Sequence, residues 1–219
     1  DGYNYTHTPD RLVKKEILRT VRYILPGAIY YCFAGQVAIF LTSIAGTTTS
    51  VAQIGALGRI NMIFGIVSVL FGILISPRFA RLPENKKILF TRFMQVELGL
   101  IAFCVCVISI IATFPEEVLW ILGKSYLNLR AELILSIGGT CLILISGCSY
   151  VLFSSRGWAI NPIITIMIEV SAIAFGISIF EISTVTGILR LGIFTASIQA
   201  LMNVGYCFFK ILKISNTIA

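Results

Sequence analysis

Charged residues and histidine are scarce in this chain of 219 residues. Asp, Glu, Lys and Arg together make up 12% of the sequence, whereas a soluble domain usually carries about 25%. The single histidine, His7, and both aspartates, Asp1 and Asp10, lie within the first ten residues. No His, Cys and Asp set has metal-ligand spacing, and no glycine-rich phosphate loop precedes a Lys-Ser or Lys-Thr pair. We therefore expect no metal, no cofactor and no enzyme chemistry.

Long apolar runs fill the rest of the chain, which is 57% hydrophobic with a mean hydropathy of +0.93. A helix needs about 20 residues to span a bilayer. Six runs reach that length: 23–46, 51–75, 93–114, 133–153, 159–180 and 185–209. Runs this long are unlike the short alternating strands of a membrane barrel. The sequence therefore predicts an all-α, polytopic membrane protein with a bundle of about six transmembrane helices at 23–209.

Lys and Arg residues gather on one side of the predicted spans. The N-terminal segment 1–22 is basic, and the loop after the second span contains Arg78, Arg81, Lys86, Lys87 and Arg92. The tail 210–219 adds Lys210 and Lys213, whereas the opposite loops hold only Lys124 and Arg130. Because basic loops favour the cytoplasm, we predict a multi-pass protein of the cytoplasmic membrane, N-in and C-in. Segments 1–22 and 210–219 are then a cytoplasmic linker and tail. The net charge of +7 is explained by membrane lipids, without nucleic acid.

A few polar residues fall deep inside the spans. Arg59, Arg190 and Glu169 are charged, and Gln36 is an amide on the first span. A charge at mid-span costs roughly 2.5–3.5 kcal/mol on insertion scales, so such residues are commonly functional. Snorkelling or a cross-bundle pair is the structural alternative. We expect Glu97 and Glu132 to be interfacial because they lie near predicted span ends.

Small and polar residues form stripes along several spans. On the second span, Gly58, Gly65 and Gly72 recur with Asn61 and Ser68 between them, and they predict a seam for a neighbouring helix. Polar stripes on the last three spans are typical either of a shared cavity or of a tight bundle: Ser136, Ser146 and Tyr150; Asn161, Thr165 and Glu169; and Thr195, Gln199 and Asn203.

Shorter features mark the boundaries of the spans. Pro26 and Pro162 are expected at helix starts, because Pro is tolerated in a first turn. Glu116 and Glu117 are expected to cap an interfacial helix at about 116–129. All six cysteines fall within spans and are expected to be buried, inert thiols. The polar start, with no initiator methionine before Asp1, leads us to expect the second part of a longer protein.

Several strings, in this order and spacing, resemble the C-terminal half of bacterial polysaccharide-biosynthesis membrane proteins. These are the O-antigen and exopolysaccharide flippases of the multidrug/oligosaccharidyl-lipid/polysaccharide exporter superfamily. The likeness runs from about Lys14 to Lys213. The strings are Leu25-Pro26-Gly27-Ala28-Ile29-Tyr30-Tyr31, Val51-Ala52-Gln53-Ile54-Gly55-Ala56-Leu57-Gly58-Arg59, Pro77-Arg78-Phe79-Ala80-Arg81, Leu122-Gly123-Lys124-Ser125-Tyr126 and Ser155-Arg156-Gly157-Trp158.

The resemblance implies one lobe of a two-lobed transporter that works by alternating access. Its substrate would be a polyprenyl-diphosphate-linked oligosaccharide for surface polysaccharide or O-antigen synthesis. Arg59, in the Gly-Ala-Leu-Gly-Arg string, is the first candidate for a diphosphate contact, followed by Gln36, Arg190 and Asn61. Glu169 is the coupling candidate. The partner lobe would be a missing N-terminal bundle of the same chain.

Three other functions are compatible with the sequence. An ion-coupled small-molecule exporter would need a tighter cavity with acidic residues on several spans. A membrane glycosyltransferase or polymerase would use Glu116 or Glu117. A non-transporting scaffold would tolerate replacement of Arg59 by Leu.

Overall fold

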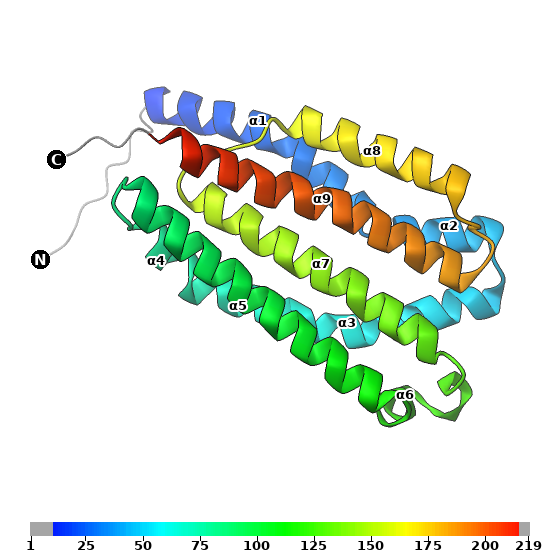
Figure 1. Ribbon diagram of the computed structural model, residues 1–219. Coiled ribbons are helices and arrows are strands. Elements are labelled where there is room, and N and C mark those ends of the chain that lie inside the picture. Colours follow the sequence, from blue (N-terminus) through cyan, green and yellow to red (C-terminus); the bar gives the residue numbers. More distant parts are fainter. Residues whose placement is uncertain (1–10, 215–219) are drawn as a thin grey trace, which may run out of the picture.

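Helices account for all regular secondary structure in residues 11–214, the part of the chain that this computed structural model describes (Figure 1). Within that range, the side chains of residues 11–14, 16, 17, 19, 20, 23, 24 and 124 are also outside the description. The helices are α1 (Arg11–Ala34), α2 (Val37–Ala45), α3 (Thr48–Leu74), α4 (Ser76–Ala80), α5 (Lys86–Thr113), α6 (Pro115–Leu122), a 3₁₀ turn η1 (Lys124–Tyr126), α7 (Arg130–Ser155), α8 (Pro162–Ile179) and α9 (Val185–Lys213).

Four of the long helices begin at a polar residue whose side chain caps the first turn. Thr47 accepts from Ser50 N before α3, and Asn85 accepts from Lys87 N before α5. Asn161 and Thr184 do the same before α8 and α9. Each side chain satisfies an amide that the helix itself leaves without a partner. Threonine and asparagine therefore set where these helices start.

The predicted all-α membrane architecture is confirmed. Five helical segments are long and apolar enough to cross a membrane: Thr48–Ala80, Lys86–Thr113, Arg130–Ser155, Pro162–Ile179 and Val185–Lys213. The pair Leu25–Ala34 and Val37–Ala45 is long and apolar enough only when taken together, and it turns by 42° at its break, as in a broken span or a re-entrant loop. Five of the six predicted runs thus correspond to helices that could each cross a membrane, and the first run corresponds to the bent pair.

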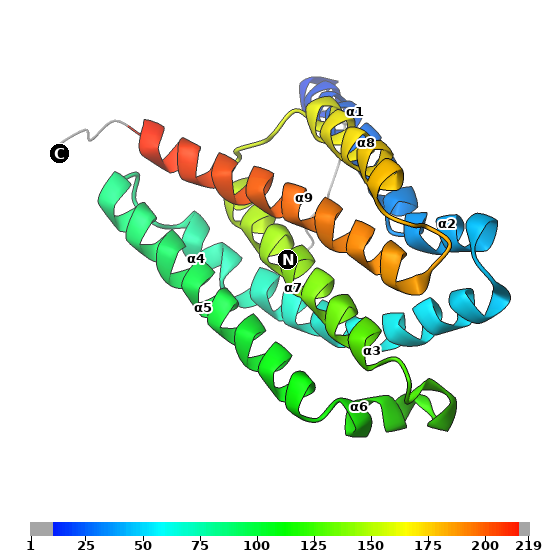
Figure 2. The ribbon, with the colours of Figure 1, turned by 45° about the vertical axis from the view of Figure 1, so that its right-hand side comes forward.

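Helices α7 and α9 form the centre of the bundle (Figures 1 and 2). Helices α3, α4 and α5 pack mainly on α7, whereas α8 packs on α9 and α1 packs on α8. The turn at 81–85, the loop at 156–161 and the end of α9 lie at one end of the bundle, which we call the basic end. Helix α6 and the start of α7 lie at the opposite end.

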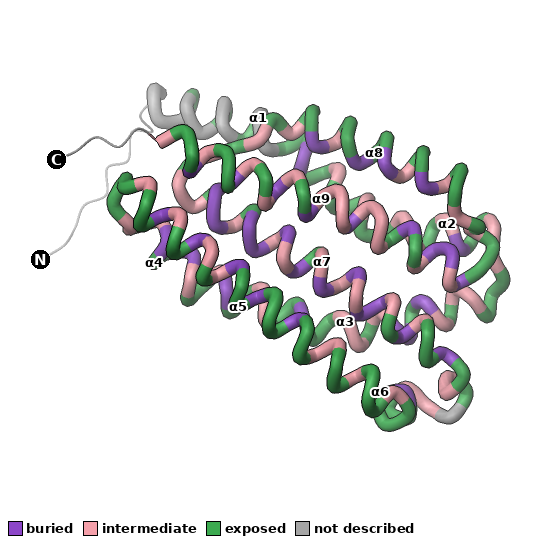
Figure 3. The backbone as a smooth tube through the Cα atoms, in the orientation of Figure 1, coloured by how far each residue is buried: buried purple, intermediate pink, exposed green. Residues whose placement is uncertain are grey.

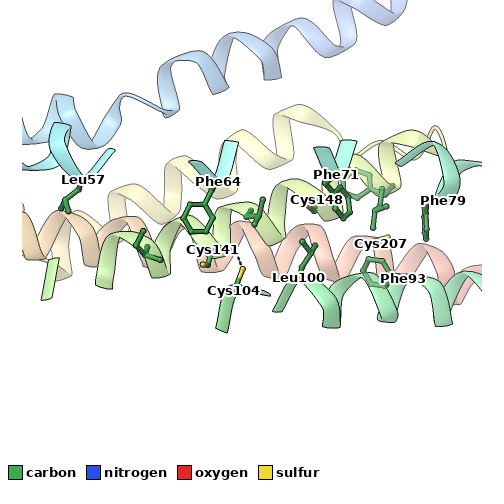
Figure 4. Close-up of a cluster of buried hydrophobic side chains, with 14 of the residues drawn as sticks. Leu57, Phe64, Phe71, Phe79, Phe93, Leu100, Cys104, Cys141, Cys148 and Cys207 are labelled. Atoms are coloured by element: carbon green, nitrogen blue, oxygen red, sulfur yellow. Dashed lines mark hydrogen bonds between the residues drawn. The ribbon is translucent and has the colours of Figure 1, made fainter. Parts of the chain in front are cut away.

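The apolar core lies between α3, α5, α7 and α9 (Figures 3 and 4). Leu57, Phe64 and Phe71 recur at intervals of seven residues, so they share the face of α3 that is buried. Phe93 on α5 is fully buried in the same cluster. Outward-facing apolar side chains surround this core, as expected for helices in contact with lipid.

Three local expectations are wrong. The first span is not one helix, because it breaks between Ala34 and Val37. Pro26 lies inside α1, whereas Pro162 does begin α8; proline inside a transmembrane helix is tolerated where neighbours re-satisfy the backbone. The interfacial helix expected at 116–129 ends at Leu122, because Gly123 adopts φ 115°, a left-handed backbone that favours glycine.

The cysteines are all free thiols, but they are not all buried as expected. Cys104, Cys141, Cys148 and Cys207 are buried, whereas Cys32 and Cys106 are exposed. The opposite environments of Cys104 and Cys106 follow from their separation of two residues, which places them on different faces of α5.

Residues 1–10 and 215–219 lie outside the described residues, and they include His7, Asp1 and Asp10. From Arg11 onward, the predicted linker is part of α1. The division into linker, bundle and tail stays a prediction.

Candidate functional site

A cavity of about 650 Å³ lies between α1, α7, α8 and α9. The loop at 157–160 lines it together with Gly27, Ala28 and Tyr31 of α1, so it lies toward the basic end. Apolar walls come from Ile143, Trp158 and Ile160. The volume is within the usual range of small-molecule sites, about 300–1,000 Å³.

Glu169 joins three helices beside this cavity. Its side chain is 8% exposed, and its Oε1 accepts from Gln199 Nε2 at 2.7 Å and from Tyr31 Oη at 3.3 Å. Gln199 Nε2 is also 3.5 Å from Tyr31 Oη. Tyr31 and Gln199 line the cavity, whereas their shared acceptor comes from α8. The cluster therefore links α1, α8 and α9 through one carboxylate.

A second polar pair lies in the cavity wall and joins α7 to α9. Asn203 Nδ2 donates to Ser146 Oγ at 2.9 Å and to Ser146 O at 3.3 Å, and both residues are buried. Thr165 and Tyr150 also line the cavity. The polar stripes predicted on the last three spans thus meet around one cavity, which was one of the two arrangements expected from their pattern.

The structure does not bring the predicted substrate-binding residues together. Arg59, Gln36 and Arg190 are exposed, and none of them lines the cavity. Arg59 is near the middle of α3, about 200° around the helix from the buried Leu57. Gln36 is in the break between α1 and α2, and Arg190 is in the second turn of α9. Their role in binding stays a prediction.

Asn61, the fourth predicted binding residue, has a structural partner in this bundle. Its Nδ2 donates to Ser136 Oγ of α7 at 2.9 Å, and its Oδ1 is buried without a hydrogen-bond partner among the described residues. The glycines beside it are not packed, because a Cβ at Gly58, Gly65 or Gly72 would meet no described atom within 4 Å. The predicted glycine seam therefore lies on α3, but no described helix packs closely against these three glycines.

Glu97 is a second buried carboxylate, and it lies in the packed core of the bundle; its interfacial depth stays a prediction. It is 4% exposed, and Ser149 Oγ lies 2.5 Å from its Oε1. Oε2 is buried without a partner among the described residues. Helix α5 begins at Lys86, earlier than the predicted span at 93, and this moves Glu97 well into the bundle. By contrast, Glu132 is in the first turn of α7, where Thr186 donates to it at 2.9 Å.

Arg156 connects two segments: the loop that lines the cavity, and the hairpin between α4 and α5. Its Nη1 lies 3.0 Å from Leu82 O and 3.2 Å from Phe79 O, and its guanidinium lies 5.5 Å from the ring centre of Trp158. Tyr206 Oη donates to Ala159 O at 2.8 Å and holds the same loop to α9. Sequence reasoning did not single out these contacts, because they join residues far apart in the chain.

The cavity and the exposed outer end of the bundle carry different polar groups. In the described part of the chain, no three His, Cys, Asp or Glu residues are grouped to hold a metal ion. Glu116, which the enzyme alternative would need, forms an ion pair with Arg130, and both side chains are exposed. The cavity instead offers neutral donors and acceptors beside one buried carboxylate.

Comparison with protein-family models, curated proteins and solved structures finds no match for this chain. The resemblance to polysaccharide flippases stays a prediction that depends on the quoted strings.

Proposed function

We propose that this chain is one lobe of a flippase that moves polyprenyl-diphosphate-linked oligosaccharides across the bacterial cytoplasmic membrane by alternating access. The observation that carries the proposal is the position of Arg59. It lies near the middle of a span, exposed, on the side of α3 that faces away from the core of this bundle. A guanidinium facing lipid at that depth costs roughly 2.5–3.5 kcal/mol. This face is therefore expected to meet water, an anion or protein.

The uncovered glycine seam supports a second bundle beside α3. Gly58, Gly65 and Gly72 leave open space where their side chains would be. Such small-residue seams allow another helix to approach closely in a membrane. We propose that the second bundle is the N-terminal lobe of the same protein, and that Arg59 lines the path between the two lobes.

The chemistry of Arg59 fits the proposed cargo. A guanidinium presents planar donors that match phosphate oxygens, and it keeps its charge under physiological conditions. The basic end of the bundle would face the cytoplasm, where the lipid-linked substrate is made. Moving one negative charge outward through an inside-negative membrane releases about 2.3 kcal/mol per 100 mV. No covalent bond changes in such a step, so no catalytic residue is required.

Glu169 is the coupling candidate within this proposal. It is buried at the contact of α1, α8 and α9 and hydrogen-bonds to two of them. A change in its charge or bound ion would alter contacts on both sides of the cavity at once, which is what coupling requires.

Replacement of Arg59 tests this function. In cells that depend on the complete protein, Arg59→Ala should cut surface polysaccharide by about tenfold at normal protein level, as expected for loss of roughly 1.4 kcal/mol of substrate interaction. Arg59→Lys should retain part of the activity because the charge is kept. Arg92→Ala is the matched control, since Arg92 is exposed and, among the described residues, donates only to Gln95 of its own helix. Normal polysaccharide from Arg59→Ala would remove Arg59 from the mechanism.

A further inference from the structure

A stripe of side chains on α9 connects the cavity to the basic end of the bundle. Asn203 lines the cavity. Tyr206, Lys210 and Lys213 follow on the same face of the helix, at intervals of three or four residues. Tyr206 Oη donates to Ala159 O of the cavity loop at 2.8 Å, and Lys210 Nζ lies 5.6 Å from the centre of the Tyr206 ring. The stripe therefore runs from the cavity wall to two cations at the basic end.

The cavity itself is uncharged, whereas the end of the stripe is positive. None of the described residues that line the cavity is charged. Glu169 hydrogen-bonds to two lining side chains but is not one of the lining residues. Neither Lys210 nor Lys213 forms an ion pair with a described residue. A ligand that matches both regions would have an uncharged part in the cavity and an anionic part at the lysines.

The cavity is open to the surroundings of the bundle along part of its wall. Three of its lining residues keep large exposed fractions: Tyr31 at 40%, Ile143 at 55% and Tyr150 at 45%. These residues belong to membrane-spanning helices, so the medium beside them is lipid hydrocarbon. The volume of about 650 Å³ is within the range of sites for drug-sized molecules, which leaves room for one lipid chain.

We propose that this cavity holds an acyl chain of an anionic phospholipid from the leaflet at the basic end, with the lipid phosphate beside Lys210 and Lys213. The lysine ammonium groups bind phosphate as point charges. Ser154 and Trp158, which line the cavity near that end, present O–H and N–H donors to the ester groups. This lipid is a resident of the cavity rather than the cargo of a flippase, so its binding does not depend on the proposed function.

The headgroup, and not the acyl chain, decides which lipid occupies the cavity. A hydrocarbon chain gains little when it moves from the bilayer into an apolar cavity, because lipid tails are as apolar as the side chains around it. Lysines near the membrane surface attract anionic headgroups. We therefore expect a preference of about tenfold, or about 1.4 kcal/mol, for phosphatidylglycerol over phosphatidylcholine with the same chains.

Quenching of Trp158 fluorescence by brominated acyl chains measures occupancy of the cavity. The chain has two tryptophans, so Trp120→Phe leaves Trp158 alone. The 219-residue chain is placed in nanodiscs of unlabelled phosphatidylcholine. Brominated phosphatidylglycerol should reach half-maximal quenching at about a tenfold lower mole fraction than brominated phosphatidylcholine. Equal quenching curves would overturn the proposal, because the lipid in the cavity would then not be selected by its charge.

Two double variants separate this site from a general attraction of anionic lipid to the basic end. Lys210→Gln with Lys213→Gln should abolish the preference for phosphatidylglycerol. Lys86→Gln with Lys87→Gln removes the same charge from α5 and should leave the preference unchanged. The pairs are matched, because each combines a half-buried and an exposed lysine. An equal loss of preference in both double variants would contradict a defined site.

A side chain added inside the cavity tests the position of the acyl chain. Gly147 of α7 lines the cavity, and a Cβ there would meet no described atom within 4 Å. Gly147→Leu should therefore occupy cavity space and weaken quenching by brominated phosphatidylglycerol about tenfold. Gly138→Leu is the control, because Gly138 is equally half-buried and open on the same helix but does not line the cavity. Undiminished quenching in Gly147→Leu would place the lipid elsewhere and overturn the proposal.

Discussion

Ser149 is the single hydrogen-bond partner that the described residues give to the buried carboxyl group of Glu97. Both side chains lie in the core between α5 and α7, and Ser149 is fully buried. A buried polar group that loses its partner keeps the full cost of having left water. The stability of the bundle should therefore depend on this serine more than its size implies.

Ser149→Ala should lower the free energy of unfolding by about 1–3 kcal/mol, the usual penalty for an unsatisfied buried group. Ser109→Ala is the matched control, because Ser109 is exposed and donates to Val105 O of its own helix. Unfolding in mixed detergent micelles measures both changes. Equal, small losses in the two variants would show that Glu97 does not need Ser149.

Two glycines on α9 should respond in opposite ways to replacement by alanine. A Cβ at Gly187 would clash with Glu181 O, a backbone atom, whereas a Cβ at Gly192 would meet no described atom within 4 Å. Gly187→Ala should therefore destabilise the protein by about 1–3 kcal/mol through forced movement of the turn before α9. Gly192→Ala should stabilise it by up to about 1 kcal/mol, because alanine is the better helix former. Thermal unfolding checks both signs, and stabilisation by Gly187→Ala would contradict this packing.

At the scale of the elements, Arg156 connects the end of α7 to the hairpin between α4 and α5. Its guanidinium reaches carbonyl oxygens at Phe79 and Leu82, and the loop that it holds forms one wall of the cavity. A hydrogen bond from a charged donor contributes about 1.5–3 kcal/mol to the free energy of unfolding. This contact therefore couples the hairpin to the cavity loop.

Arg156→Ala should increase amide hydrogen exchange both at residues 79–85 and at residues 157–160, with a loss of about 1.5–3 kcal/mol in local stability. The exposed Arg92, whose described partner is Gln95 of its own helix, again supplies the control, and Arg92→Ala should leave both segments protected. Faster exchange in only one of the two segments would show that they are not coupled through Arg156.

Most element boundaries could be predicted from the sequence, because apolar runs and capping residues act locally. The spans at α3, α5, α7, α8 and α9 all follow from apolar length. The break after Ala34 was missed because Gly35 and Gln36 stand between two apolar stretches, and two residues do not end an apolar run. The early end of α6 depends on the positive φ of Gly123, and the sequence does not show that this glycine needs it.

The candidate site could be predicted only in part, since its residues come from four helices. The depth of Glu169 and the stripe containing Gln199 were visible in the sequence. That Tyr31 would reach Glu169 could not be predicted, because their contact spans 138 positions of the chain. The charged residues Arg59 and Arg190 were found by the same depth argument, but they face outward from this bundle. Depth alone does not determine which side of a helix meets the cavity.

At the scale of the whole molecule, the described bundle has two distinct surfaces of interest. One includes the exposed mid-span arginine and the uncovered glycine seam, and the other is the aromatic cavity. The arginine and the seam lie on α3, where Arg59 is exposed and the glycines leave open space beside them. The cavity is lined by α1, α7, α8, α9 and the loop at 157–160. The proposed function places the substrate path on the α3 surface, which is separate from the cavity.

The most direct test of the proposed flippase function is to measure in which leaflet the lipid-linked oligosaccharide resides. In cells depleted of the complete protein, we predict that the lipid-linked repeat unit accumulates in the cytoplasmic leaflet. A membrane-impermeant glycan-modifying enzyme should then reach it only in inverted vesicles, where that leaflet faces out. Wild-type protein should restore its access in intact spheroplasts, and Arg59→Ala should not. Unchanged access in intact spheroplasts after depletion would contradict the proposed function.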